Sequence, residues 1–504
     1  MNIRQAKEYI KDSVNLYLKK NEFGEYRIPV VRQRPIFLLG APGIGKTAIM
    51  EQIAQELGVA LVSYSMTHHT RQSALGLPFI TQKVYGGREY QVSEYTMSEI
   101  IATIYDTMEE SGIREGILFL DEINCVSETL APSLLQFLQY KIFGRHQVPE
   151  GWVVVTAGNP PEYNKSVREF DVVTMDRLKL LEVEPDFGIW KEYAMERRVH
   201  PAIVNFLDLK KEYFYCMEMT AKGRSYVTAR GWEDLSEMLA LYEEEQMAVE
   251  ESLVGQYIRN DRIVKEFTAY YDLYNKYKKD YRINEILEGH APAQAIARAK
   301  EAAFDERLAL LGMLSDRVLA DMREVMEQAA FLKDLTAPLK AVKAGAETAR
   351  TEQIVEQLEQ MAEGRRKRME SQRVANSLSD AEAKRHLRVI RFLEERKREL
   401  YTGEQTSGAE AFERIRNRYD GTVAQMRQET ERVQAELAAL FAFVEEAFAQ
   451  GNEMLILMTE LTVDNAAARF IASFGSPDYQ RHNREMLLSE RSDDIMAQID
   501  ELGL

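Results

Sequence analysis

One short segment constrains the fold of this chain more than any other. Residues 40–47 read Gly-Ala-Pro-Gly-Ile-Gly-Lys-Thr and fit the pattern G-x-x-x-x-G-K-[ST], between an apolar run at 35–39 and a helix-like stretch at 47–57. A glycine-rich turn in that context points backbone N–H groups at phosphate oxygens, and the helix N-terminus adds its positive dipole end. The pattern therefore predicts a phosphate-binding loop. Its expected contacts are Gly40, Ala41, Pro42, Gly43, Ile44, Gly45, Lys46, Thr47 and Ala48.

Two side chains of this loop have expected roles of their own. Lys46 is placed to reach the β- and γ-phosphates of a nucleotide, and the Thr47 hydroxyl is placed to bind Mg²⁺. The alternative is a glycine-rich turn that fits the pattern by chance. The strand before it and the helix after it disfavour that alternative.

A second motif lies downstream, where the apolar run 116–120 ends in two acids, Asp121 and Glu122. In a parallel sheet the end of such a strand lies at the same edge as the phosphate-binding loop. Asp121 is then expected to hold Mg²⁺, and Glu122 to orient and deprotonate an attacking water. The alternative is a strand that ends in solvated acids. It is disfavoured because a phosphate-binding loop precedes the pair at a suitable distance.

A third apolar run, 152–157, is followed by Asn159. If this strand lies between the first strand and the strand of Asp121, the Asn159 side chain points at the terminal phosphate and can hold the water. The alternative is that Asn159, Pro160 and Pro161 form a simple turn.

Short apolar runs alternate with helical stretches up to about residue 183, which is typical of βαβ units and a mostly parallel sheet. From about Asp186 we expect the strands to stop. Beyond residue 250 the chain is rich in Ala, Glu, Lys, Arg and Leu and almost lacks proline, which favours long helices. We therefore predict an α/β nucleotide-binding domain at 1–185, an α-helical lid at 186–250, and a helical extension with a coiled-coil-like hairpin at 251–504. Ser379 and Glu382 form a capping-box pattern within that extension.

Charge and composition exclude several classes of protein. The net charge is −17, so the chain has no general attraction to nucleic acid or to anionic membranes. The two cysteines, Cys125 and Cys216, are too few for a disulfide scaffold or a four-cysteine zinc site. No apolar run approaches the roughly 20 residues that span a bilayer. We expect a cytoplasmic protein without a membrane segment, and a nucleic-acid partner is disfavoured.

With these motifs in place, residues 28–241 resemble the AAA+ ATPases, and specifically the MoxR family. Residues 40–47 resemble the Walker A motif, 117–122 the Walker B motif, and Asn159 the sensor-one residue. The segment 175–178 resembles the one that carries an arginine finger, and 228–232 resembles the sensor-two segment. The resemblance implies an αβα P-loop core that hydrolyses ATP with Mg²⁺ bound by Thr47 and Asp121. It implies catalytic roles for Glu122, Asn159, Arg177 and Arg230.

The resemblance also implies partners. AAA+ proteins form closed rings, usually hexamers, and an arginine finger acts on the nucleotide of a neighbouring subunit. Arg177 is our choice for that finger, and Arg168 is the competing residue. The helical half resembles, more weakly, the tails of firmicute-type MoxR ATPases that are encoded beside a von Willebrand factor A domain protein. Such a protein is therefore an expected client.

An insert adds one more feature that resembles the MoxR family. Gly76–Ile80 and Tyr90–Val92 flank the turn Tyr85–Arg88, and this pattern predicts a β-hairpin. Its tyrosines, Tyr85, Tyr90 and Tyr95, either contact a substrate or pack across the strands. Three functions remain open at this point. They are a ring-forming, chaperone-like ATPase that remodels or activates a protein, a DNA-associated motor, and a nucleotide-gated scaffold.

Overall fold

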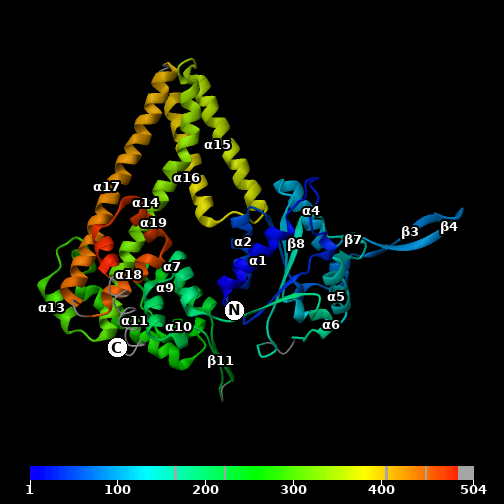
Figure 1. Ribbon diagram of the computed structural model, residues 1–504, viewed down its shortest axis with the longest axis horizontal. Helices are drawn as coiled ribbons and strands as arrows, with labels where there is room; N and C mark the ends of the chain where they lie inside the picture. Colours follow the sequence, from blue (N-terminus) through cyan, green and yellow to red (C-terminus); the bar gives the residue numbers. More distant parts are fainter. Residues whose placement is uncertain (164–166, 221–222, 403–406, 449–450, 486–504) are drawn as a thin grey trace, which may run out of the picture. The chain divides into compact units, whose positions relative to one another are not determined.

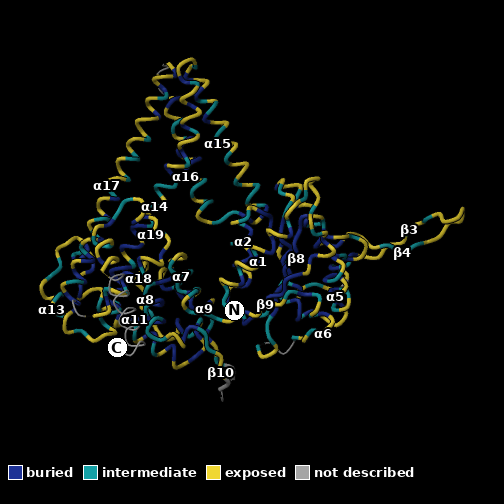
Figure 2. The backbone as a smooth tube through the Cα atoms, in the orientation of Figure 1, coloured by how far each residue is buried: buried dark blue, intermediate teal, exposed yellow. Residues whose placement is uncertain are grey.

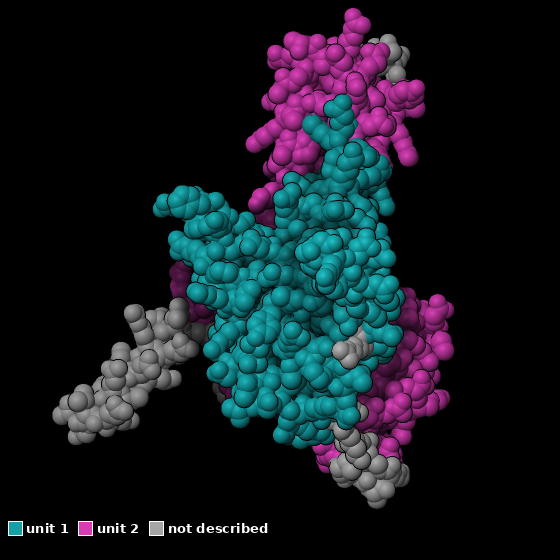
Figure 3. Space-filling view, turned by 90° about the vertical axis from the view of Figure 1, so that its right-hand side faces the viewer, with its two compact units in different colours: residues 1–189, 228–230, 360–391 teal, residues 190–227, 231–359, 392–504 magenta. Residues whose placement is uncertain are grey.

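The computed structural model describes residues 1–163, 167–220, 223–402, 407–448 and 451–485. The chain divides into two compact units, coloured separately in Figure 3. Unit 1 consists of Met1–Ile189, Thr228–Arg230 and Gln360–Arg391, and unit 2 of Trp190–Val227, Gly231–Glu359 and Phe392–Leu504. The chain therefore returns to unit 1 twice after it first leaves it.

A five-stranded parallel sheet forms the centre of unit 1, with the strand order β2-β5-β8-β1-β9. The strands are β1 (Ile36–Gly40), β2 (Ala60–Ser65), β5 (Gly116–Asp121), β8 (Trp152–Gly158) and β9 (Lys179–Val183). Strand β8 is buried along its whole length, which explains its unbroken apolar sequence. It pairs with β5 on one side and β1 on the other, so the predicted position of this strand is confirmed.

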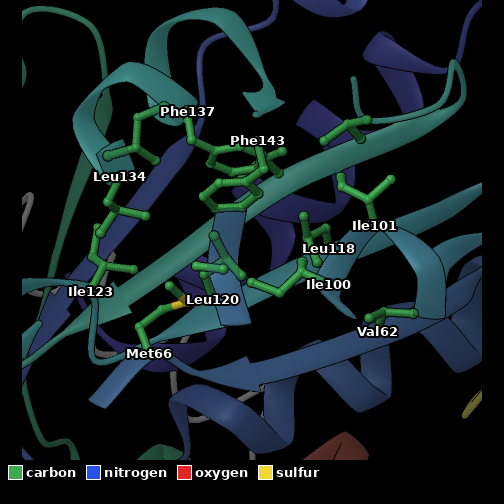
Figure 4. Close-up of a cluster of buried hydrophobic side chains, with 14 of the residues drawn as sticks. Val62, Met66, Ile100, Ile101, Leu118, Leu120, Ile123, Leu134, Phe137 and Phe143 are labelled. Carbon is green, nitrogen blue, oxygen red and sulfur yellow. The ribbon is translucent and has the colours of Figure 1, made fainter. Parts of the chain in front are cut away.

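Helices cover the sheet of unit 1. They are α1 (Ile3–Tyr17), α2 (Lys46–Leu57), α3 (Arg71–Leu75), α4 (Glu99–Ser111), α5 (Ala131–Tyr140) and α6 (Val172–Met175). Between α4, α5 and the sheet lies an apolar core, shown in Figure 4. The rings of Phe137 and Phe143 stack there at 3.9 Å between centroids, where α5 meets the short hairpin of β6 (Ile142–Phe143) and β7 (His146–Gln147).

The predicted β-hairpin is confirmed as β3 (Pro78–Tyr85) and β4 (Arg88–Tyr95). Gly86 and Gly87 form its turn with φ of 57° and 80°, values that favour glycine. The hairpin extends away from the sheet, and most of its residues are exposed (Figures 1 and 2). The Tyr85 and Tyr90 rings contact each other across the strands, with centroids 6.1 Å apart.

Unit 2 is mainly helical. Its two longest helices, α14 (Phe304–Ala346) and α17 (Gly408–Phe448), pack against each other. The others are α8 (Pro201–Leu209), α10 (Glu251–Tyr257), α11 (Asp261–Tyr281), α12 (Ile283–Leu287), α13 (Ala293–Glu301), α18 (Glu453–Val463) and α19 (Asn465–Phe474). The predicted fold class, a parallel α/β core followed by a long helical region, is confirmed.

The expectation that strands stop near residue 186 is wrong. Strands β10 (Cys216–Thr220) and β11 (Gly223–Val227) form an antiparallel pair within the segment that we predicted to be a helical lid. Each strand has five residues and pairs with the other, so no long apolar run marks either one in the sequence.

Four helices have residues in both units: α7 (Phe187–Glu196), α9 (Ala229–Glu244), α15 (Thr351–Val374) and α16 (Asp380–Thr402). The predicted capping box at the start of α16 is present. Glu382 N donates to Ser379 Oγ at 3.3 Å, and Ser379 N donates to Glu382 Oε2 at 3.4 Å. Among the helices that the structure describes, none is both long enough and apolar enough to cross a lipid bilayer.

Candidate functional site

The loop between β1 and α2 has the backbone conformation that its glycines predict. Gly43 and Gly45 have φ of 74° and 90°, and Gly45 directly precedes the first residue of α2. A Cβ atom at Gly43 would lie 3.1 Å from Thr228 Cβ. Gly43 therefore meets two demands at once, a left-handed backbone and a close approach by the start of α9.

Lys46 lies within this loop with its ammonium group almost buried, at 8% exposure of the residue. Its Nζ donates to Gly40 O and Ala41 O, both at 2.8 Å, and to Asn159 Oδ1 at 2.9 Å. Burial lowers the Lys46 pKa to about 8. The charges of Asp121 and Glu122 oppose this decrease, whereas the charge of Arg230 adds to it. A bound polyphosphate would supply the negative charge that this buried ammonium lacks.

Two oxygen atoms of the kind that Mg²⁺ prefers lie together at the edge of the sheet. The Thr47 hydroxyl, in the first turn of α2, donates to Asp121 Oδ2 at 3.2 Å. The other carboxylate oxygen of Asp121 accepts from the Glu122 N–H at 2.8 Å. Within the described part of the chain, no cluster of three or more acidic, histidine or cysteine side chains is able to hold a metal by itself. Such a sparse ligand set fits Mg²⁺, which is commonly bound by one or two protein groups together with substrate phosphates.

Glu122 follows β5 in a left-handed conformation, with φ of 56° and ψ of 36°. Its Oε2 accepts a hydrogen bond from Ser65 Oγ at 3.0 Å and another from Thr67 Oγ1 at 2.9 Å. Ser65 ends β2, where it pairs with Asp121 of β5. The two hydroxyl groups thus fix the carboxylate of the proposed base. Ser65 and Thr67 were not among the residues predicted for the site. Hydroxyl residues at the end of a strand are a signal, but their contact with Glu122 depends on the order of the strands.

A second asparagine supports Asn159. The Asn124 side chain is buried and its Nδ2 donates to Asn159 O at 2.8 Å. A Cβ atom at Gly158 would lie 2.4 Å from Asn124 Oδ1, so a side chain there would displace the Asn124 amide. Asn124 was also absent from the sequence prediction. Its amide fixes the backbone beside Asn159, whose own side chain accepts from Lys46.

The three arginines have different surroundings. The charge of Arg230 lowers the pKa of Lys46, so Arg230 lies near the phosphate-binding loop. Thr228, two residues earlier, also lies beside this loop, at Gly43. Arg168 forms an exposed ion pair with Glu128 at 2.6 Å. Among the described residues, the guanidinium of Arg177 forms no hydrogen bond or ion pair. The structure thus brings Arg230 to the site, whereas Arg177 interacts electrostatically with Asp171.

Residues 35–178 match the sequence model of a known family, described as the AAA domain of the dynein-related subfamily. This segment is an AAA domain. It begins at β1, ends just before β9, and contains Lys46, Asp121, Glu122 and Asn159. The chain therefore carries a nucleoside triphosphatase domain of the ATPase type, and the prediction of ATP binding is supported at that level. No curated protein matched the sequence.

Proposed function

We propose that this protein hydrolyses ATP in a ring of identical subunits and uses the energy to remodel or activate a partner protein, as MoxR-type ATPases do. The observation that carries the proposal is the meeting of Lys46, Asp121, Glu122 and Asn159 at one edge of the sheet. Lys46 begins α2, Asp121 and Glu122 lie at the end of β5, and Asn159 follows the end of β8. The AAA domain at 35–178 supports the same conclusion.

Each group has a distinct role in this proposal. The loop N–H groups and Lys46 hold the phosphates, and Thr47 with Asp121 holds the Mg²⁺, which neutralises charge that develops on the phosphate oxygens. Glu122 accepts the proton of the attacking water, and the two hydroxyl groups that donate to its Oε2 hold the carboxylate in place. Asn159 orients that water and Arg230 acts on the nucleotide of its own subunit.

Arg177 is proposed to complete the site of a neighbouring subunit. A guanidinium at the terminal phosphate stabilises the charge of the transition state. Among the described residues Arg177 interacts with Asp171 only electrostatically, without an ion pair or hydrogen bond from its guanidinium, whereas Arg168 is paired with Glu128. This contrast favours Arg177 over Arg168 as the finger.

A complementation experiment tests the ring and the finger together. Arg177→Ala and Glu122→Gln subunits are each expected to be nearly inactive alone, while Arg168→Ala keeps its turnover. When the two inactive variants are mixed, a subunit with an intact Glu122 receives Arg177 from its neighbour. ATP turnover therefore returns. A mixture that stays as inactive as its components would contradict the shared site.

The partner is proposed to be a protein, and a von Willebrand factor A domain protein is the specific expectation. The β3–β4 hairpin supports a protein partner because it exposes apolar side chains, among them Phe79, Ile80, Val84 and Tyr85. Retention of such a partner by Glu122→Gln in ATP, and its loss in ADP, tests this expectation. Turnover that rises with DNA and not with protein would instead favour a DNA-associated motor.

A further inference from the structure

The turn between α15 and α16 docks on the edge of the sheet of unit 1. Strand β2 is an outer strand of that sheet. Leu61 N donates to Ala375 O at 2.8 Å, and Asn376 Nδ2 donates to Leu61 O at 3.1 Å. Ala375 and Asn376 thus satisfy both backbone polar groups of Leu61, which a free sheet edge would leave to solvent.

This docking is part of the core of unit 1. Ala375 is fully buried and belongs to the same apolar cluster as Ala60 and Val62 of β2. The Ser371 hydroxyl donates to Ser111 O at the end of α4, which forms a second attachment. Asn376 adopts φ of 51°, a left-handed conformation that asparagine tolerates better than most residues. The turn is therefore held by burial, backbone bonding and its own conformation.

Strand β2 joins this turn to the catalytic base. Leu61 and Ser65 lie on one continuous strand, and Ser65 Oγ donates to Glu122 Oε2 at 3.0 Å. Thr67, two residues further on, donates to the same oxygen at 2.9 Å. The register of β2 with β5 is fixed residue by residue from Ala60 to Ser65. Leu61 and the hydroxyls that hold Glu122 are therefore connected by a short stretch of chain, most of it a paired strand.

We propose that the α15–α16 turn positions Glu122 through β2, and that it links the helical region to ATP turnover. Asn376 is then a positioning residue, not a catalytic one. Both helices that meet at the turn continue into unit 2, so the chain itself connects the held strand to the helical region. The inference rests on the proposed ATPase function and adds a route for its regulation.

Asn376→Gly isolates the relevant contact. Glycine adopts the left-handed conformation without strain and lacks only the amide that bonds Leu61 O. Because one hydrogen bond is removed at a distance from the nucleotide, kcat is expected to fall about three- to tenfold while KM for ATP changes less than about twofold. Amide hydrogen exchange at residues 61–67 of the nucleotide-free protein is expected to become faster. Asn376→Asp places a carboxylate against the same carbonyl. It is expected to lower kcat further and to make hydrogen exchange at residues 61–67 faster still.

Two further variants separate positioning from general damage. Lys384→Ala changes an exposed residue of the same segment and is expected to leave kcat and hydrogen exchange unchanged. Combining Asn376→Gly with Ser65→Ala is expected to lower kcat no further than the stronger single change, because both act on the same contact to Glu122. Fully additive losses would contradict a route through Ser65.

The outcomes for the inference and for the proposed function are distinct. If the wild-type protein hydrolyses ATP and Asn376→Gly keeps full kcat with unchanged hydrogen exchange, the positioning role of the turn is wrong and the ATPase proposal stands. If the wild-type protein has no turnover, the ATPase proposal fails, and the catalytic role of the turn fails with it.

Discussion

Lys46 Nζ donates a hydrogen bond to Asn159 Oδ1 at 2.9 Å, across 113 residues of sequence. The contact joins the phosphate-binding loop to the end of β8 because β8 lies beside β1 in the sheet. It places an amide oxygen next to the ammonium that is proposed to bind phosphate, and it gives the first prediction.

Replacing Asn159 with alanine is expected to lower kcat by about 100-fold, since a polar group that orients the water is lost from a preorganised site. ATP affinity is expected to change much less, because the loop and Lys46 remain. Steady-state turnover together with a nucleotide-binding titration checks both statements. A variant with wild-type kcat would show that Asn159 has only a structural role.

The lowered pKa of Lys46, about 8 in the nucleotide-free protein, predicts linked proton uptake. At pH 6.5 Lys46 is already protonated, so it contributes no proton uptake to ATP binding there. At pH 8 to 9 a growing fraction is neutral, and binding of the polyanion restores the charge, so a proton is taken up. Above pH 8, affinity is expected to fall by up to about tenfold per pH unit.

Calorimetric titration in buffers of different ionisation enthalpy measures this uptake directly. Lys46→Arg provides the control, because arginine stays protonated throughout this pH range. Equal proton uptake by the wild-type protein and Lys46→Arg would assign the effect to another group.

The hydroxyls that hold Glu122 give a third prediction. Ser65→Ala and Thr67→Val are each expected to lower kcat roughly three- to tenfold with little change in KM, because each removes a hydrogen bond to a charged group. Ser63→Ala alters an exposed hydroxyl on the same strand and serves as the matched control. Loss of turnover in Ser63→Ala as well would point to damage of β2 in general.

Asp316 in α14 predicts a pH-dependent change in stability. Burial raises the pKa of Asp316 to about 7, with Glu460 and Asp208 acting in the same direction and Lys191 and Arg323 opposing them. The unfolded chain ionises this carboxyl near pH 4, so wild-type stability decreases as the pH rises from about 4 to 7 and then stays level. Asp316→Asn removes that loss. The variant is expected to gain unfolding free energy relative to the wild-type protein. This gain is expected to be greater at pH 7.5 than at pH 5, by a difference on the order of 3 kcal/mol.

Thermal unfolding of both proteins at these two pH values measures the effect. Tyr270 and Tyr274 of α11 also interact with Asp316. The unfolding of both proteins is therefore measured at pH values well below those at which tyrosine ionises. An Asp316→Asn protein whose stability follows the wild-type pH profile would contradict the assignment.

Local patterns in the sequence were sufficient for the loop, the acidic strand end and the parallel sheet. Each of those depends on neighbouring residues, as with Lys46 after its glycines or Asp121 after its apolar run. The contacts of Ser65 and Thr67 with Glu122 required the order of the strands. The hydrogen bond from Asn376 to Leu61 joins residues 315 positions apart, and no local sequence pattern predicts it. Long-range pairings of this kind are set by tertiary packing, which a single sequence does not display.

The most direct test of the central claim compares ATP turnover and nucleotide retention in the wild-type protein and in Glu122→Gln. The wild-type protein is expected to release phosphate from ATP only when Mg²⁺ is present. Glu122→Gln is expected to keep ATP bound and to release phosphate at least about 100-fold more slowly, because a carboxamide cannot accept the proton of water. Phosphate release by Glu122→Gln at the wild-type rate, or a wild-type protein that binds no ATP, would contradict the account.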